Sequence, residues 1–334
     1  MRAITLTEFG SADNFRLVEL PTPPLREGDV RIRVKAISFN PVDYQIRKGL
    51  PEARRIRSQI LGQDLSGVVD EAHASVKGFR PGDEVYTYLC DRASSGSYAE
   101  LVSVPEELVA KKPRRLSHEQ AAAIPVAGIT ARLALEKVAA GPSRSLFIAG
   151  GAGGVGTFAI MQARQLGIRR LIATAGNPKS HAYLLEKCGL DEPQIVNYRD
   201  DHFVTQAFER NGGPFDCVLD LVGGQMLSAC CRLLAIDGEL ASITEAPAEE
   251  DFELLFQRNA GFHPIGANAY SLTEDRDRWR RYQTMLAEFS RLFDSGALAA
   301  PHVTSVGTLS VEAVRRAHDL LERSAVQGKL VMGC

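Results

Sequence analysis

A glycine cluster at residues 150–156 constrains the fold of this chain more than any other feature. The cluster, Gly-Gly-Ala-Gly-Gly-Val-Gly, follows a short apolar run over 145–150 and precedes a stretch, 155–166, with apolar side chains at helical spacing. This order predicts a strand, a glycine turn and a helix. Such a turn presents backbone N–H groups at a helix N-terminus, where the macrodipole favours negative charge, and glycine leaves room for a pyrophosphate. The stretch therefore predicts a dinucleotide site, with a tight turn that binds nothing as the alternative.

The composition narrows the class of protein. The chain has 334 residues, enough for two domains, and its apolar and charged fractions of 45% and 24% are those of an ordinary globular protein. A formal net charge of −2 provides no field that would gather nucleic acid. No uninterrupted apolar run reaches membrane-spanning length, and Met1–Leu6 alternates polar and apolar residues as a strand does. We therefore expect a cytoplasmic protein with neither nucleic acid nor a membrane as a partner.

The six cysteines argue against a zinc site formed by residues that are close in sequence. They include no C-x-x-C pair and no cysteine near a histidine at ligand spacing. We expect six reduced, mostly buried thiols. Ligands that are distant in sequence remain open as an alternative.

The N-terminal part of the chain has the pattern of a β-rich domain. Residues 29–37 alternate apolar and basic side chains with period two, which predicts a strand with one buried face. Further short segments, at 65–71, 84–88 and 98–104, are rich in strand formers and are separated by turn signals. Many short strands without strong helices predict a compact antiparallel barrel or sandwich.

The pattern changes near Ser117, where a capping-box spacing begins a helical segment. Strands and helices then alternate, which predicts a doubly wound parallel sheet. The expected strands are 145–150, 170–175, 194–198, 215–221 and 238–243, and the expected helices are 155–166, 179–188, 201–210 and 225–235. The alternation ends near residue 262, and the remaining tail is too small for a core of its own. We expect residues 1–123 and 264–334 to form one domain and residues 124–263 to form a second, inserted domain.

The segment after the second expected strand bears on the choice of cofactor. An NAD-preferring site carries an acid about 20 residues past the glycine turn, to bind the ribose hydroxyls. Here the segment 173–180 contains no acid and ends in Lys179 and Ser180. A cation and a small donor suit the 2′-phosphate of NADPH. The alternative is that Lys179 is a solvated residue in the first turn of a helix.

Eight ordered motifs carry a resemblance to a known family. They are Asn40-Pro-Val-Asp43, Leu61-Gly-Gln-Asp-Leu-Ser-Gly67, Pro81-Gly-Asp83, Gly96-Ser-Tyr-Ala-Glu100, Pro125-Val-Ala-Gly-Ile-Thr-Ala131, Ala149-Gly-Gly-Ala-Gly-Gly-Val-Gly156, Asn197-Tyr-Arg199 and Gly328-Lys-Leu-Val331. In order and distance they resemble the medium-chain dehydrogenase/reductase superfamily, and most closely its zinc-independent quinone oxidoreductase branch. The resemblance implies an α/β protein in which a GroES-like β-rich catalytic domain carries an inserted Rossmann-type doubly wound parallel sheet domain that binds NADPH. It also implies a homodimer.

Two departures from the zinc-dependent relatives indicate chemistry without a metal. Asn40 stands where those alcohol dehydrogenases have a cysteine, and Gln63 stands at the histidine of their Gly-His-Glu motif. Neither side chain supplies the thiolate or imidazole that zinc prefers. Without that Lewis acid, an alcohol substrate loses its usual activation, whereas a quinone or an α,β-unsaturated carbonyl is already electrophilic. We therefore expect hydride transfer to a small-molecule quinone or enone, with a zinc alcohol dehydrogenase or a non-catalytic NADPH sensor as alternatives.

The resemblance also implies the site residues. The expected catalytic residues are Asn40, as a donor to the carbonyl oxygen that gains negative charge, and Asp43, either in proton transfer or in orienting its neighbours. A turn that ends a strand is the alternative for Asn40. The expected cofactor contacts are Asn40, Thr130, Gly153, Gly154, Val155, Gly176, Lys179, Tyr198, Val222, Thr244 and Lys329, and no metal ligand is expected. Residues 51–57 and 246–268 are expected to border the acceptor pocket.

Overall fold

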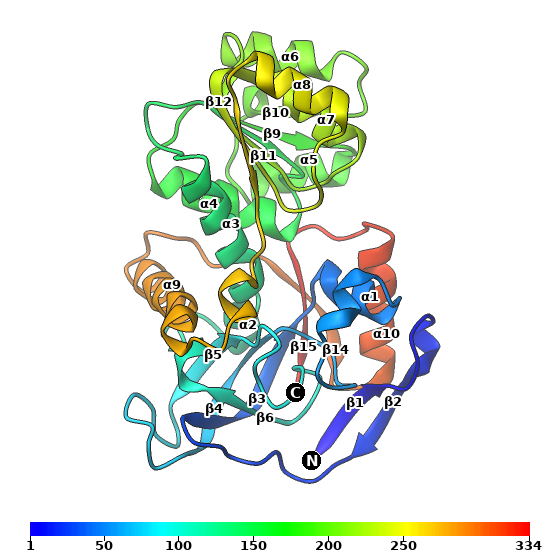
Figure 1. Cartoon of the computed structure of the whole chain (residues 1–334), viewed down its shortest axis with the longest axis vertical. Helices are drawn as coiled ribbons and strands as arrows, with labels where there is room; N and C mark the ends of the chain where they lie inside the picture. The colour runs from blue at the N-terminus through cyan, green and yellow to red at the C-terminus, as the bar shows by residue number, and fades with distance from the viewer. The chain divides into compact units, whose positions relative to one another are not determined.

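The computed structural model describes residues 1–334 except for the side chain of Arg55, and it forms two compact units (Figure 1). The first unit comprises Met1–Ile129 with Asn268–Cys334, and the second comprises Thr130–Ala267. Both boundaries lie a few residues later in the chain than we expected. The helix α3 (Pro125–Lys137) begins in the first unit and ends in the second. The boundary between the two units therefore coincides with no break in secondary structure.

The second unit is built on a six-stranded sheet in which every pair of neighbouring strands is parallel. Its strand order is β10-β9-β8-β11-β12-β13. The strands are β8 (Leu146–Ala149), β9 (Leu171–Ala175), β10 (Ile195–Asn197), β11 (Phe215–Asp220), β12 (Leu234–Ser242) and β13 (Gly261–Pro264). Because the strand order reverses at β8, the carboxyl end of β8 lies at a topological switch point, where sheets of this kind bind ligands.

Helices cover both faces of this sheet. They are α4 (Gly154–Gln165), α5 (Pro178–Glu186), α6 (Phe203–Asn211), α7 (Gln225–Leu233) and α8 (Glu249–Gln257). Buried side chains of α6, α7 and α8 share one core cluster with Phe147 and Ile172 of the sheet. Because strand side chains alternate, Ala173 points to the face opposite Ile172. Ala173, Leu184 of α5 and Ile160 of α4 all lie around Gly151 on that face. The expected doubly wound fold is confirmed.

One strand of this sheet was not expected. We predicted that the alternation would end near residue 262, but Gly261–Pro264 pairs with β12 as a parallel edge strand. The segment is short, and its sequence, Gly-Phe-His-Pro, has no apolar alternation. Its place in the sheet is set by pairing with β12 and not by its own pattern.

The first unit contains a seven-stranded sheet with the order β14-β15-β3-β4-β5-β7, in which β6 also pairs with β3. All of its pairs are antiparallel except β14 with β15. Its strands are β3 (Asp29–Ser38), β4 (Asp64–Ala72), β5 (Glu84–Tyr88), β6 (Leu101–Pro105), β7 (Val109–Lys111), β14 (Val303–Thr308) and β15 (Lys329–Gly333). A separate hairpin joins β1 (Arg2–Leu6) to β2 (Phe15–Glu19). The antiparallel, β-rich character that we expected is confirmed.

The C-terminal tail completes the first unit, as we predicted. β15 pairs with β3, and Tyr86 Oη of β5 donates to the carbonyl oxygen of Leu286 in α9 (Arg276–Asp294) at 2.5 Å. The helices of this unit are α1 (Pro41–Arg47), α2 (His118–Ala122), α9 (Arg276–Asp294) and α10 (Val311–Glu322), with the first part of α3. Short 3-10 helices occur in the chain at Ala12–Asn14, Pro51–Arg55, Glu106–Leu108, Glu192–Gln194 and Ala269–Leu272.

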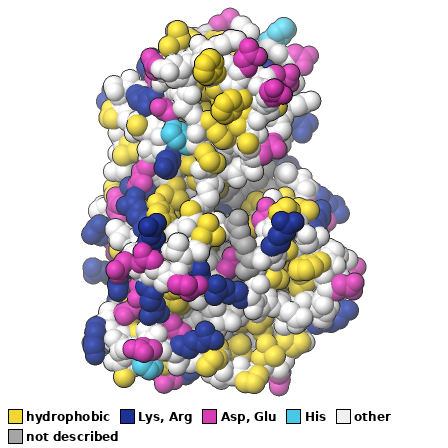
Figure 2. Space-filling model, viewed as in Figure 1, with side chains coloured by type: hydrophobic (Ala, Val, Ile, Leu, Met, Phe, Trp, Pro, Cys, Tyr) yellow, Lys and Arg dark blue, Asp and Glu magenta, His cyan; other side chains and the backbone are white. Residues whose placement is uncertain are grey.

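The structure shows a charged surface and cysteines that are mostly buried. Side chains of both charge signs are interspersed over the face shown in Figure 2. Across residues 1–334, no helix has the length and apolar character needed to cross a membrane. The six cysteines are free thiols, and only Cys334 is exposed.

Candidate active site and dinucleotide site

A buried polar cluster lies where three strands of the first unit meet. Asn40 follows β3 and immediately precedes α1, which begins at Pro41. Asp64 is the first residue of β4, and Lys329 is the first residue of β15. Ser38 of β3 is paired with Asp64 on one side and with Val331 of β15 on the other. The strand register therefore brings together the ends of segments that are far apart in the sequence.

Hydrogen bonds fix the orientation of the Asn40 amide in this cluster. Lys329 Nζ donates to Asn40 Oδ1 at 2.6 Å and to the carbonyl oxygen of Phe39 at 2.9 Å. Asn40 Nδ2 donates to Asp64 Oδ2 at 2.9 Å. An ammonium group can only donate and an ionised carboxylate can only accept, so the oxygen and nitrogen of the amide are assigned. The amide keeps a second Nδ2 hydrogen that it can donate.

Burial gives the acids of this cluster unusual proton affinities. Asp43, in the first turn of α1, is fully buried, and this burial raises its pKa to about 7 although the backbone N–H of Asn40 donates to its Oδ2 at 2.8 Å. Burial likewise raises the pKa of Asp64 to about 6, against the stabilising charge of Lys329. The same burial lowers the pKa of Lys329, and Asp64 opposes this shift. The cluster can therefore exchange a proton near neutral pH.

Two further buried rings extend from Asp43: Tyr98 beside it, and His318 beside Tyr98. Tyr98 lies close enough to lower the pKa of Asp43 by hydrogen bonding, and its Oη is 3.1 Å from Nε2 of His318 in α10. Burial lowers the pKa of His318 to about 3, so this imidazole is neutral at physiological pH. We predicted no role for either residue, because nothing in the sequence distinguishes a buried histidine from a solvated one.

The glycine turn of the second unit follows β8. A Cβ on Gly156 would lie 2.3 Å from the carbonyl oxygen of Gly150, and one on Gly151 would lie 2.8 Å from Cβ of Ala173. These two glycines are therefore required by packing within the turn. Gly153, the N-cap residue of α4, is different, because a Cβ there would meet only the Gly150 oxygen, at 3.4 Å. No described side chain fills the space beside Gly153 at the start of α4, where Gly154 and Val155 lie, and the backbone N–H groups of a helix N-terminus favour an anion.

Three more of the expected cofactor contacts lie at or just after the carboxyl ends of β9 and β10. Tyr198, which follows β10 and is 40% exposed, lies directly over Gly176, where a Cβ would come within 2.5 Å of its ring. Lys179 is exposed in the first turn of α5. The Ser180 hydroxyl accepts from the backbone N–H of Gly176 and donates to the carbonyl oxygen of Asn177. Both of these hydrogen bonds stabilise the turn that precedes α5. The structure therefore brings Gly176 and Tyr198 together, with Lys179 as the nearby exposed cation of the segment.

The carboxyl ends of β11 and β12 carry two more expected residues, Val222 and Thr244. Val222 is 52% exposed. Asp220 Oδ1 accepts from the backbone N–H groups of Val222 and Gly223, and its Oδ2 accepts from the Thr244 hydroxyl at 3.1 Å. Asp220 thus shapes both loops, and sequence reasoning missed it. Thr130, the remaining residue, is buried in α3 at the start of the second unit.

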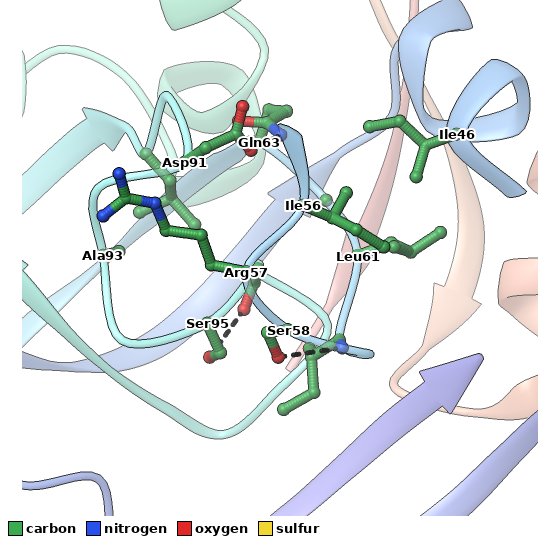
Figure 3. A pocket seen from close by; sticks show the side chains of 13 residues that line it. Ile46, Ile56, Arg57, Ser58, Leu61, Gln63, Asp91, Ala93 and Ser95 are labelled. Carbon is green, nitrogen blue, oxygen red and sulfur yellow. Dashed lines mark hydrogen bonds between the residues drawn. The ribbon is translucent and has the colours of Figure 1, made fainter. Parts of the chain in front are cut away.

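A small pocket, partly open to solvent, lies in the first unit (Figure 3). The expected pocket-bordering loop 51–57 contributes Ile56 and Arg57 to its lining. The Arg55 side chain of that loop lies outside the described residues. Gln63 also lines the pocket, whereas its neighbour Asp64 belongs to the buried cluster. Within the described part of the chain, no group of three or more His, Cys, Asp or Glu side chains is arranged to hold a metal ion.

Comparison with known proteins identifies the family. Residues 26–114 match the family described as alcohol dehydrogenase GroES-like domain, and residues 189–332 match the family described as zinc-binding dehydrogenase. The chain is 30% identical to a 2-methylene-furan-3-one reductase from Solanum lycopersicum over 99% of this chain and 79% of that protein. It is 29% identical to an NADPH-dependent alkenal/one oxidoreductase from Arabidopsis thaliana, over 78% of this chain and 66% of that protein.

Solved structures agree with this result. A protein from Rhizobium etli named as a zinc-dependent alcohol dehydrogenase matches with a TM-score of 0.88 at 27% identity, over 100% of this chain and 98% of that chain. The quinone oxidoreductase from Escherichia coli, in complex with NADPH, matches with a TM-score of 0.84 at 25% identity, over the full length of both chains. The fold and the site thus define an oxidoreductase that uses a nicotinamide cofactor. The chain belongs to the medium-chain dehydrogenase/reductase superfamily, as the motifs indicated.

Proposed function

We propose that the protein is an NADPH-dependent, zinc-independent oxidoreductase that reduces quinones or α,β-unsaturated carbonyls by hydride transfer. The observation that carries the proposal is the Asn40 amide, held between Lys329 and Asp64. This amide stands where a zinc-dependent relative has a thiolate ligand, and both of its ends are engaged with charged side chains. It suits hydrogen bonding to a carbonyl oxygen and does not suit metal binding.

The residues of the cluster have complementary roles in the proposed reaction. The reduced nicotinamide, when bound, supplies the hydride. Asn40 donates its second Nδ2 hydrogen to the acceptor oxygen, where negative charge develops. Lys329 and Asp64 hold the amide in that orientation. Asp43 is able to store or release a proton near pH 7, and water completes the protonation of the product.

We assign the two domains and the cofactor contacts as follows. The first unit, Met1–Ile129 with Asn268–Cys334, is the catalytic domain, which contributes Asn40 and Lys329 to the nicotinamide end. The second unit, Thr130–Ala267, is the dinucleotide domain. There Gly153, Gly154 and Val155 bind the pyrophosphate, Gly176, Lys179 and Tyr198 bind the adenosine end, and Thr130, Val222 and Thr244 bind the nicotinamide half. The room beside Gly153 and the exposure of Lys179 support this assignment.

The decisive experiment follows NADPH oxidation with a panel of quinones and enones. We expect turnover of some acceptors and no stoichiometric zinc by elemental analysis. Tight NADPH binding without turnover of any acceptor would instead support a sensor, and one zinc per chain with alcohol oxidation would support a zinc dehydrogenase. An Asn40→Ala variant with normal NADPH binding and unchanged turnover would remove Asn40 from the mechanism.

The preference for NADPH has its own test. We expect Lys179→Ala to raise KM for NADPH by about tenfold or more and to leave KM for NADH unchanged, because only NADPH carries the 2′-phosphate. Lys187→Ala, an exposed lysine just past α5, is the control. Equal KM values of the wild-type enzyme for the two cofactors would contradict the preference.

We also propose a cytoplasmic homodimer that binds neither nucleic acid nor membranes. The edge strand β13 pairs only with β12 among the strands of residues 1–334, and the neighbouring α8 exposes Phe252 and Phe256. An open edge beside exposed aromatic rings is suited to pairing with a second copy. Six free thiols suit a reducing compartment. Sedimentation at about twice the chain mass of 36.4 kDa and recovery in the cytoplasmic fraction are the expected results.

A further inference from the structure

Gln63 is an unusual member of the pocket lining in the first unit. The pocket wall is largely apolar, with Ile46, Ile56 and Leu61 among its side chains (Figure 3). Gln63 lines the same pocket but is only 7% exposed. A polar side chain that is more than nine-tenths buried normally has all of its hydrogen-bonding groups paired.

The orientation of the Gln63 side-chain amide follows from its hydrogen bond to Asp91. Nε2 of Gln63 donates to Asp91 Oδ1 at 2.8 Å, and an ionised carboxylate can only accept. The nitrogen end of the amide therefore faces Asp91 and the oxygen end cannot. Oε1 of Gln63 has no hydrogen-bond partner among the described residues. The pocket thus contains a buried acceptor of fixed orientation.

The backbone around Asp91 is held in a costly conformation. Cys90 and Asp91 have φ values of 40° and 59°, a region that residues other than glycine rarely adopt. The preceding residue, Leu89, donates its backbone N–H to the carbonyl oxygen of Gln63 at 2.8 Å. Two consecutive left-handed residues therefore place the Asp91 carboxylate beside the Gln63 amide. Such strain persists where the surrounding structure enforces a required side-chain position.

The two serine hydroxyls of the lining do not bond to this acceptor. The Ser95 hydroxyl donates to the carbonyl oxygen of Gly96, and the Ser58 hydroxyl oxygen accepts from the backbone N–H of Ile60. Since no described residue donates to Gln63 Oε1, a molecule that enters the pocket can supply the hydrogen bond.

We propose that Gln63 Oε1 accepts a hydrogen bond from the acceptor substrate, so that this site selects quinones or enones that carry a hydroxyl or amide N–H group in addition to the reducible system. The proposal rests on the proposed function for the nature of the substrate. Asp91 is a positioning residue in this proposal, since it fixes the orientation of the Gln63 amide. A site built to bond a hydroxyl discriminates strongly against an analogue that lacks it, because the buried acceptor is then left unpaired.

The test compares matched aryl enones that carry a hydroxyl, a methoxy group or a hydrogen at the same ring position. For the wild-type enzyme we expect kcat/KM to be higher for the hydroxylated enone by about tenfold or more. Gln63→Met keeps the length of the side chain and removes the acceptor, and it should bring the ratio to about one. Asp91→Asn should also reduce the ratio, since an asparagine amide can donate to Oε1 and satisfy it within the protein. Gln257→Met, the same substitution on the exposed surface of α8, should keep the wild-type ratio.

A wild-type ratio near one, or a Gln63→Met enzyme that keeps the wild-type preference, would overturn the proposal while leaving enone reduction in place. A second arm separates it from the proposed function. The affinities of the saturated hydroxyaryl ketone and its methoxy analogue are measured by calorimetry in the presence of NADP⁺, where no reduction can occur. Tighter binding of the hydroxyl compound that is lost in Gln63→Met supports the proposal even if no enone is turned over. Equal affinities refute it.

Discussion

Lys329 Nζ lies 2.6 Å from Asn40 Oδ1, although 289 residues separate the two in the sequence. The contact exists because β15, which begins at Lys329, pairs with β3, which ends two residues before Asn40. It places a buried ammonium group against the amide that we propose as the hydrogen-bond donor to the substrate oxygen. The same ammonium lies 3.6 Å from Asp64 Oδ2, so Lys329 is the counter-charge for the buried acids of the cluster.

Replacement of Lys329 by methionine should destabilise the first unit. Without the ammonium, Asp64 and Asp43 remain buried with no neighbouring cation in the cluster, and removal of one partner from a buried charge pair costs about 3 kcal/mol. The free energy of unfolding from urea titration measures the effect. Lys187→Met, at an exposed site, should change it by less than about 0.5 kcal/mol. Equal stabilities of the two variants would show that Lys329 does not neutralise the cluster.

Asp43→Asn should change how stability depends on pH. Because burial raises the pKa of Asp43 to about 7, the folded protein binds a proton that the unfolded chain releases near pH 4. This group therefore contributes full stability below about pH 4, and that contribution is lost as pH rises to about 7. The asparagine keeps an acceptor for the backbone N–H of Asn40 and does not ionise. Relative to the wild type, the variant should gain at least about 1 kcal/mol between pH 4 and pH 8.

The measurement for this prediction is urea unfolding of the wild type and the variant at several pH values. Asp201→Asn, at an exposed position, is the control and should run parallel to the wild type. A difference between wild type and Asp43→Asn that does not vary with pH would mean that Asp43 titrates alike in the folded and unfolded chains.

Two glycines of the turn after β8 should respond differently to alanine. Gly156→Ala places a Cβ against the backbone oxygen of Gly150 and should cost about 2 kcal/mol of stability. Gly153→Ala meets no backbone clash, so it should fold normally but weaken NADPH binding by about tenfold, because its Cβ occupies space meant for the pyrophosphate. Thermal unfolding and fluorescence titration with NADPH measure the two effects. A Gly153→Ala protein that binds NADPH with wild-type affinity would show that the pyrophosphate does not bind at this turn.

Gly176→Ala should displace the Tyr198 ring, since the new Cβ would lie within 2.5 Å of it. Tyr198 is partly exposed and can move, so we expect a cost in stability of only about 1 kcal/mol. If Tyr198 binds the adenosine end, the Kd for NADPH should rise by about fivefold or more. Gly141→Ala, where a Cβ has open space, is the matched control for both quantities. Unchanged NADPH affinity in Gly176→Ala would exclude Tyr198 from the cofactor site.

Local patterns in the sequence predicted much of the architecture. The alternation over 29–37 became β3, and the strand, glycine turn and helix around residue 150 became β8 and α4. The edge strand β13 and the division of the chain within α3 were missed, because both depend on contacts between segments and not on local periodicity.

The residues of the candidate site likewise include some that sequence motifs identified and some that only the structure revealed. Asn40, Asp43 and Lys329 were singled out from motifs, but their partner Asp64 was not, since no sequence pattern reports that a carboxylate will be fully buried. Asp220 was missed for a similar reason, because its role is to accept hydrogen bonds from the loops after β11 and β12.

The sequence by itself determined the secondary-structure alternation, the glycine turn and the absence of soft metal ligands at Asn40 and Gln63, because each of these depends on residue type and local spacing. Only the tertiary structure decided the pairing of Lys329 with Asn40, the raised pKa of Asp43 and the unpartnered oxygen of Gln63. Those properties arise from strand register, burial and hydrogen bonds between distant segments, and a single strand or turn carries no information about which distant groups will surround it.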